Sequence, residues 1–186
     1  MKTKRYFNQI LKPYKTIAKE IFGNYTDVEI VIGEKFCCYC QDKNDLSIEI
    51  PVTEDPVGAK AFYEKMLKRL NQYKIKEKYS SDILSFLHEV GHIMTYNKFY
   101  AYVYIIGANL IAKLLSTNFI CNSKILTQMC YNCYFNLKLE KNADKWAMIY
   151  IKNHPEQVKN WETMLDKNYK KIIPKLLEKG LVPTNE

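Results

Sequence analysis

Two histidines lie four residues apart in the segment SFLHEVGHIMTY, residues 85–96, and a glutamate directly follows the first of them. On a helix, side chains four positions apart lie on the same face, so His88 and His92 can direct ring nitrogens to one metal ion. Zinc binds imidazole nitrogens at about 2.0–2.1 Å, and this spacing supplies two ligands without distorting the backbone. The pattern therefore predicts a metal site on a helix.

Glu89 is one residue further along and is rotated by about 100° around the helix axis. From there its carboxylate cannot comfortably join the two ligands, but it can reach a water on the metal, which suits a general base. Gly91 is informative because a glycine inside a helix costs about 0.5–1 kcal/mol relative to alanine. A helix tolerates that cost where another element packs against its backbone, so we predict close packing at Gly91.

A catalytic zinc site has three protein ligands and an open position, so a third ligand is needed. The helical pattern LEKNADKWAMIYI, residues 139–151, carries Glu140 and Asp144 on one face. One carboxylate can bind zinc while the other accepts a hydrogen bond from a ligand histidine and fixes its tautomer. Glu140, Asp144 and His154 are the candidates for the third ligand. Surface ion pairs with neighbouring lysines are the other interpretation of the two acids.

The pattern HEVGH followed by EKNAD resembles that of the gluzincin metallopeptidases, which is HExxH followed by ExxxD. The forms HExGH and ExxAD are similar to those of CAAX prenyl endopeptidase-type enzymes and of small soluble zinc peptidases from phages and mobile elements. The resemblance implies a zincin-like fold, in which an edge strand pairs with an extended substrate, and one catalytic Zn²⁺ ion. It also implies these roles: His88, His92 and Glu140 as ligands, Glu89 as general base, and Asp144 as the partner of a ligand histidine.

The predicted activity is hydrolysis of peptide bonds in a protein or peptide substrate, by a zinc-activated water with Glu89 as base. The reaction needs a further donor for the oxyanion. The candidates, by position alone, are Tyr96, Tyr131, Tyr134 and Tyr150. The alternative is a catalytically idle zincin-fold protein that acts as a binding module, with nucleic acid as one partner because the net charge is +8. No nucleic-acid motif supports that partner, and the lysine-rich run 64–79 is also explained by a solvated helix face.

The fold that must position these residues is predicted to be of the α+β class, with a small antiparallel sheet of about three strands before a mostly helical body. Alternating apolar residues indicate the strands within 27–52, and the last of them, 45–52, is predicted to be the substrate-aligning edge. The first helix is either continuous or broken at Pro13. Helical periodicity predicts helices over 3–22, 59–73, 80–96, 98–116, 122–153 and 155–178.

The 186 residues suit a single domain, with a loose tail at about 180–186. The most apolar run, 99–112, is shorter than a membrane span and is interrupted by Asn109, so it predicts a buried core helix and no membrane span. The N-terminal segment lacks the apolar stretch of a secretory signal. A cytoplasmic location is therefore expected.

Six cysteines are present, and in the cytoplasm their thiols are expected to be reduced. Cys130 and Cys133 have the spacing of metal ligands, whereas the segment CCYC, with Cys37, Cys38 and Cys40, does not form a standard zinc knuckle. Buried or half-buried thiols among aromatic side chains are therefore predicted in preference to a second, structural zinc site.

Overall fold

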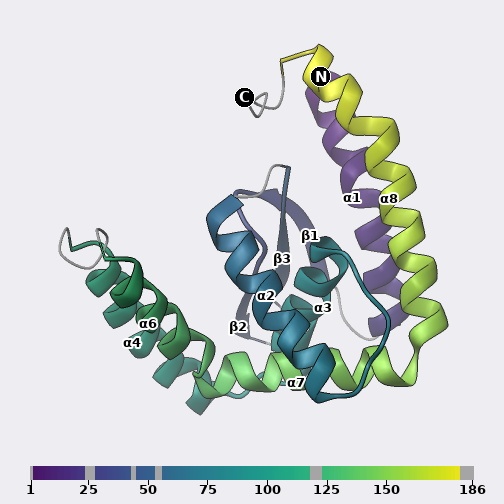
Figure 1. Ribbon diagram of the computed structural model, residues 1–186. Coiled ribbons are helices and arrows are strands. Elements are labelled where there is room, and N and C mark those ends of the chain that lie inside the picture. Colours follow the sequence, from purple (N-terminus) through teal and green to yellow (C-terminus); the bar gives the residue numbers. More distant parts are fainter. Residues whose placement is uncertain (1, 24–27, 43–44, 53–55, 118–122, 181–186) are drawn as a thin grey trace.

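A small sheet and a larger set of helices make up the computed structural model (Figure 1), which describes residues 2–23, 28–42, 45–52, 56–117 and 123–180. This arrangement confirms the α+β prediction. Of the predicted loose tail at about 180–186, only Gly180 lies within the described residues. The elements are α1 (Lys2–Phe22), β1 (Val28–Gly33), β2 (Cys37–Asp42), β3 (Asp45–Pro51), α2 (Pro56–Gln72), α3 (Ser81–Met94), α4 (Lys98–Leu115), α6 (Lys124–Phe135), α7 (Lys138–Asn153) and α8 (Pro155–Glu178).

The sheet is mixed, so the prediction of an antiparallel sheet is wrong. The strand order is β1-β3-β2, with β1 parallel and β2 antiparallel to β3. Strand β3 has the clearest alternation of apolar residues, and Leu46, Ile48 and Ile50 are all buried. A central strand pairs on both sides and buries more of its side chains than an edge strand, which explains why β3 takes that place. The predicted substrate-aligning edge, 45–52, is thus the central strand, and β1 and β2 are the edges.

The helices agree with the predicted periodicity, with one division that was not predicted. Helix α1 continues through Pro13 without a break. The helix predicted across 122–153 is two helices, α6 and α7, because the backbone at Leu137 adopts an extended conformation, with φ −57° and ψ 144°. A peptide unit in that region cannot continue the helical hydrogen-bond pattern. The chain therefore changes direction at Leu137, between the α4–α6 pair and α7.

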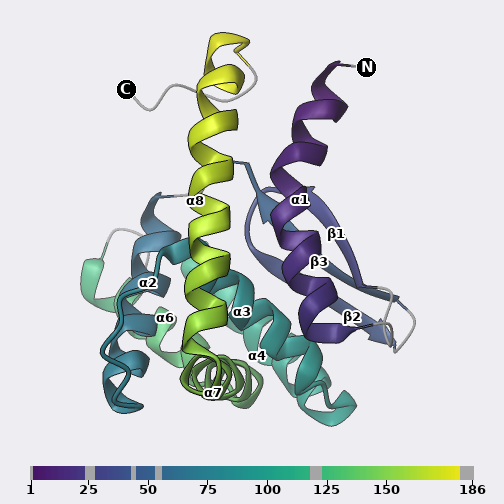
Figure 2. The same ribbon diagram turned by 90° about the vertical axis from the view of Figure 1, so that its right-hand side faces the viewer.

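Helix α3 lies at the centre of the molecule and is buried without a break from Ile83 to His92. It contacts α2, α7, α8 and strands β2 and β3. Helices α1 and α8 lie side by side, and α1 also contacts the sheet at β1 (Figure 2). The main hydrophobic core joins side chains from α1, the sheet, α3, α7 and α8. The helix with the two histidines therefore packs against five other elements, which suits a helix that must keep ligands in fixed positions.

Helices α4 and α6 form a pair that extends away from this core (Figure 1). The prediction of a buried core helix over 99–112 is wrong, because Ile105, Ile106 and Leu110 of α4 are each more than half exposed. Helices α4 and α6 contact each other and α7, and these contacts leave much of the apolar side of α4 exposed. None of the described helices is both long and apolar enough to cross a membrane.

Candidate metal centre

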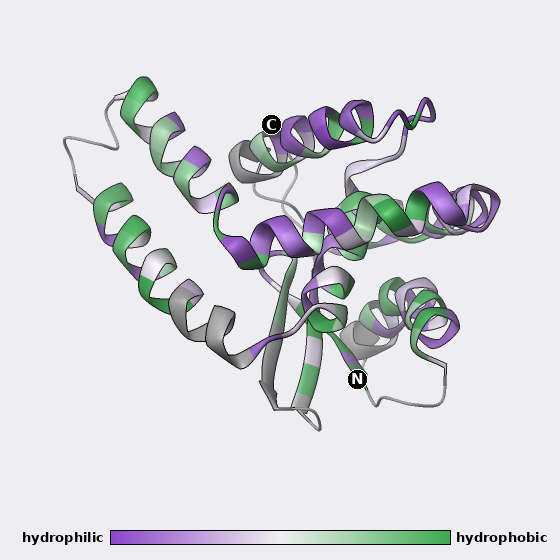
Figure 3. Cartoon of the chain, turned by 90° about the horizontal axis from the view of Figure 1, so that it is seen from below, coloured by the Kyte–Doolittle hydropathy of each residue, from purple (hydrophilic) through white to green (hydrophobic). Residues whose placement is uncertain are grey.

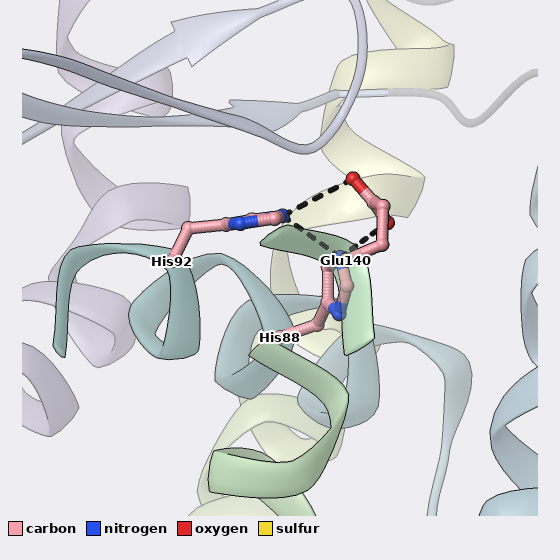
Figure 4. Close-up of side chains that lie close together, drawn as sticks. All are labelled: His88, His92 and Glu140. Carbon is pink, nitrogen blue, oxygen red and sulfur yellow. Dashed lines mark hydrogen bonds and ion pairs between the residues drawn. The ribbon is translucent and has the colours of Figure 1, made fainter. Parts of the chain in front are cut away.

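Three side chains converge where α3 crosses α7, namely His88 and His92 from α3 and Glu140 from the first turn of α7 (Figure 4). The Nε2 atoms of the two histidines are 3.1 Å apart. Glu140 Oε2 lies 3.2 Å from His88 Nε2, and Glu140 Oε1 lies 3.4 Å from His92 Nε2. All three side chains are buried. Among the described residues, this is the one group of three or more histidine, cysteine, aspartate or glutamate side chains that is compact enough to hold a metal ion.

The separations in this group fit a tetrahedral zinc site. At bond lengths of about 2.0–2.1 Å, tetrahedral geometry places neighbouring ligand atoms about 3.3 Å apart. The closest ligand-atom distances here, between 3.1 and 3.4 Å, are close to that value. Two imidazoles and one carboxylate are also a donor set of catalytic zinc, which leaves the fourth position for water or substrate. The residues present thus fit the metal in both geometry and chemistry.

The close approach of α3 to α7 depends on Gly91. A Cβ atom at Gly91 would lie 2.6 Å from the carbonyl oxygen of Ala143 and 2.9 Å from its Cα. The close packing predicted at this glycine is confirmed, and the neighbour is the backbone of α7. Ala143 is itself fully buried and lies between Glu140 and Asp144. The small residues at the crossing therefore let both acids of α7 reach the histidine face of α3.

Asp144 does not join the three ligand atoms but contacts the other side of His88. Its Oδ1 lies 2.9 Å from His88 Nδ1, so Asp144 can fix the ring orientation while Nε2 points to the metal position. Two cations from α2 hold the same carboxylate. Lys65 Nζ is 2.9 Å from Asp144 Oδ1, and Arg69 Nε is 3.2 Å from Oδ2. The network therefore continues through three helices.

Lys65 and Arg69 were missed by the sequence analysis, which explained their lysine-rich segment as a solvated face. The side chain of Lys65 is 9% exposed, and its ammonium lies 4.6 Å from the ring centres of both Phe62 and Phe135. The spacing of charged residues in the sequence could have indicated this contact between α2 and α7. Lys65 and Arg69 are four residues apart on α2, as Glu140 and Asp144 are on α7, so two complementary pairs of charges can face each other.

The charges in the network shift one another's protonation. Burial would raise the pKa of Asp144, but contacts with His88 and Lys65 outweigh it and hold that pKa at about 2. Burial would likewise raise the pKa of Glu140, but the two histidines keep it well below its ordinary value. Burial and the Lys65 ammonium oppose protonation of His88, yet Glu140 and Asp144 outweigh them and raise its pKa to about 9. Without a metal, a proton on His88 therefore balances the buried carboxylates.

A cavity of about 500 Å³ opens beside the ligand group. Glu89 lines this cavity together with His88, His92 and Glu140, so the predicted general base shares the space where a substrate would lie. The remaining walls come from β2 and its preceding turn, α2, the connection between α3 and α4, the first turn of α7 and the α4–α6 pair. The described residues contributed by these elements are Lys35, Phe36, Cys37, Cys38, Phe62, Tyr96, Tyr104, Ile105, Tyr134, Phe135 and Leu139.

Two tyrosines of the α4–α6 pair line this cavity with their hydroxyl groups hydrogen bonded to each other. These are Tyr104 and Tyr134, and burial raises the pKa of both phenols, so both stay protonated; one hydroxyl donates to the other, and the accepting hydroxyl keeps its own proton for a further bond. Tyr96 also lines the cavity, whereas Tyr131 does not, and Tyr150 stacks on Trp161 instead. Tyr104 was not among the predicted candidates because its segment was interpreted as core.

The other predicted alternatives lie apart from the ligand group. His154 is exposed at the junction between α7 and α8. Cys37 and Cys38 are half-buried on β2, whereas Cys130 is half-buried and Cys133 exposed on α6, and none of these four belongs to a metal-binding group within the described residues. The side chain of Cys40 and the whole of Cys121 lie outside the described part of the chain.

Comparison of the chain with models of protein families, with curated proteins and with solved structures gives no match. A function is therefore inferred from the geometry of the site.

Proposed function

We propose that the chain is a zinc-dependent metallopeptidase of gluzincin type with a zincin-like fold. The observation that carries this proposal is the convergence of His88, His92 and Glu140, at metal-ligand separations, beside a cavity that Glu89 also lines. Buried ion pairs are on average no more stabilising than apolar side chains of similar volume, so stability alone does not account for this group. Metal binding and catalysis do account for it.

Each residue has a role that follows from its position. A zinc ion held by His88, His92 and Glu140 would supply a Lewis acid for the scissile carbonyl and lower the pKa of a bound water. Glu89 accepts the proton of the attacking water and delivers it to the leaving amine. Asp144 holds the ring of His88, so that its Nε2 stays directed to the metal position.

The walls of the cavity complete the proposed chemistry. Tyr104 and Tyr134 present protonated hydroxyl groups, which suit hydrogen bonding to the oxyanion. Strand β2 is an edge of the sheet, and Cys37 and Cys38 at its start line the cavity. An extended peptide that adds to the free edge of β2 would lie along the site, as edge strands commonly bind peptides. We therefore assign substrate alignment to β2 and not to β3.

Metal content tests the ligand assignment. The wild-type chain is purified and dialysed against limiting zinc. Inductively coupled plasma mass spectrometry is then expected to find about one zinc ion per molecule. Glu140→Ala is expected to lose most of it, because two histidines alone leave the site incomplete. His154→Ala is the matched control and is expected to keep zinc, since that histidine is exposed at a helix junction. Full zinc retention by Glu140→Ala would refute the third ligand.

Cleavage tests the catalytic assignment. The wild type is incubated with a peptide mixture made by digesting whole-cell protein, and new N-termini are identified by mass spectrometry. We expect Glu89→Gln to keep its zinc and its circular dichroism spectrum but to cleave at least about 100-fold more slowly, as expected for loss of a general base. No cleavage by zinc-loaded wild type, or equal cleavage by the variant, would favour the catalytically idle binding module instead.

A further inference from the structure

Among the described residues, the α4–α6 pair carries most of the exposed large apolar side chains, and both of its helices contain hydrophobic stretches (Figure 3). Nine large apolar side chains are exposed in all, and six of them belong to these two helices, with exposed fractions from 40% to 74%. They are Ile105, Ile106, Leu110, Leu114, Ile125 and Met129. Single exposed apolar residues are ordinary on a soluble protein, but a concentration on one projecting element indicates a contact surface.

The spacing on α4 gives this surface a direction. Ile106, Leu110 and Leu114 are each four residues apart, so they form one stripe along the helix. Lys113 is exposed beside that stripe. An exposed apolar stripe can enter the interfacial layer of a membrane, while a lysine beside it extends its ammonium to the headgroups.

The charge of the segment points to the chemistry of the partner. Residues 90–139 contain no aspartate or glutamate, whereas they contain four lysines, Lys98, Lys113, Lys124 and Lys138. The segment therefore carries a net charge of +4, half of the +8 of the whole chain. A second copy docked through the same surface would bring two such segments together with no acid to balance them. An anionic lipid surface supplies the opposite charge and an apolar layer at once.

We propose that the α4–α6 pair docks on the surface of an anionic lipid bilayer, with its exposed apolar side chains in the interfacial layer and the exposed Lys113 among the headgroups. The pair lies on the surface and does not cross it, which agrees with the absence of a membrane-spanning helix among the described residues. Because Ile105, at the base of the pair, also lines the cavity, the docked pair would bring the cavity close to the lipid. This docking does not depend on metal binding.

Vesicle flotation tests the proposal with the purified full-length chain. We expect it to bind phosphatidylcholine vesicles that contain phosphatidylserine much more strongly than pure phosphatidylcholine vesicles, and to bind less as salt is raised. Leu110→Glu and Ile106→Glu are each expected to weaken binding by about tenfold or more, because each removes a buried apolar group and adds repulsion. Ile149→Glu on α7 is the matched control, since that side chain is similarly apolar and 41% exposed, and its binding should stay unchanged.

Several results would overturn the proposal. One is the absence of vesicle binding at low salt, and another is equal binding to both kinds of vesicle with no effect of salt. A third is a loss of binding by Ile149→Glu as large as that by Leu110→Glu. Analytical ultracentrifugation without lipid gives the remaining test, because a dimer that Leu110→Glu dissociates would assign the surface to a second copy. Circular dichroism and zinc content of each variant, matched to wild type, exclude misfolding as the cause.

Discussion

The crossing of α3 and α7 at Gly91 yields a sharp prediction for Gly91→Ala. At an ordinary helical position this change stabilises a protein by about 0.5–1 kcal/mol. Here the added Cβ would lie 2.6 Å from the Ala143 oxygen, which is 0.4 Å inside the 3.0 Å limit of real Cβ contacts (3.0 − 2.6). The obstacle is backbone and cannot rotate away, so α7 must move. Overpacking of this kind costs about 1–3 kcal/mol, and we expect a net loss of about 1–2 kcal/mol in the free energy of unfolding.

The same displacement should weaken metal binding. Metal–ligand distances tolerate deviations of about 0.2 Å, whereas α7, which carries Glu140, must shift by about twice that. We therefore expect zinc affinity, measured by competition with a chromophoric chelator, to fall by about 10- to 100-fold, similar to the loss of an outer hydrogen-bond partner.

A second helical glycine provides the matched control for this prediction. Gly107 lies in α4, where an added Cβ would approach only the end of the flexible Leu137 side chain, at 3.1 Å. Gly107→Ala is expected to keep wild-type zinc affinity and to be as stable as wild type or slightly more so in urea unfolding of the metal-free protein. The reasoning is refuted if Gly91→Ala is as stable as Gly107→Ala and binds zinc equally well.

Three further predictions concern the network around the site. The pKa of His88 is raised from 6.5 to about 9, so the proton on this histidine stabilises the metal-free protein fully below pH 6.5. As the pH rises to 9, the free energy of unfolding, measured with urea in EDTA, should fall by an amount on the order of 3 kcal/mol. Zinc affinity should rise over the same pH range, because the metal binds the neutral imidazole. A pH-independent zinc affinity would contradict this. Lys65→Met should destabilise the metal-free protein by about 3 kcal/mol and the zinc-loaded protein by less, because the metal replaces the missing charge; equal losses would count against it. Tyr134→Phe should keep zinc but lower kcat for peptide cleavage by about 10²-fold, and an unchanged kcat would remove this tyrosine from the mechanism.

The ligand group could be predicted from sequence because its geometry is mostly local. The separation of four residues between His88 and His92 fixes their relative position once the segment is helical. Glu140 is 48 residues further on (140 − 92), and no local rule places it near them. Its segment was found because zinc needs a third ligand and because Glu140 and Asp144 repeat the same spacing on a second helix, and the resemblance to the gluzincin pattern implied Glu140 as the ligand. The number of ligands that zinc needs thus directed the search to a residue that local sequence rules do not connect with the histidines.

The parts that sequence reasoning missed depend on which element packs on which. Strand order was predicted from adjacency in sequence, but β3 inserted between β1 and β2 because its alternation is the most apolar. The apolar segment of α4 was assigned to the core because hydropathy records the preference of a side chain and not its surroundings. Tyr104 was lost with that assignment. Each error has the same cause, since burial is a property of the assembled molecule.

The walls of the cavity differ in how they are held, and this difference bears on function. The ligands, Glu89 and Asp144 lie on α3 and α7, which cross at a backbone contact in the core. Tyr104 and Tyr134 lie on the α4–α6 pair, which projects from the body (Figure 1) and contacts α7, and many of its apolar side chains are exposed. Elements with few core contacts open at lower free energy than the core does, so the tyrosine wall can move without displacing the ligands. If the proposed function holds, we expect metal binding to depend on the stiff crossing and access to the site to depend on the α4–α6 pair, so that mutations in the two regions affect zinc affinity and substrate KM separately.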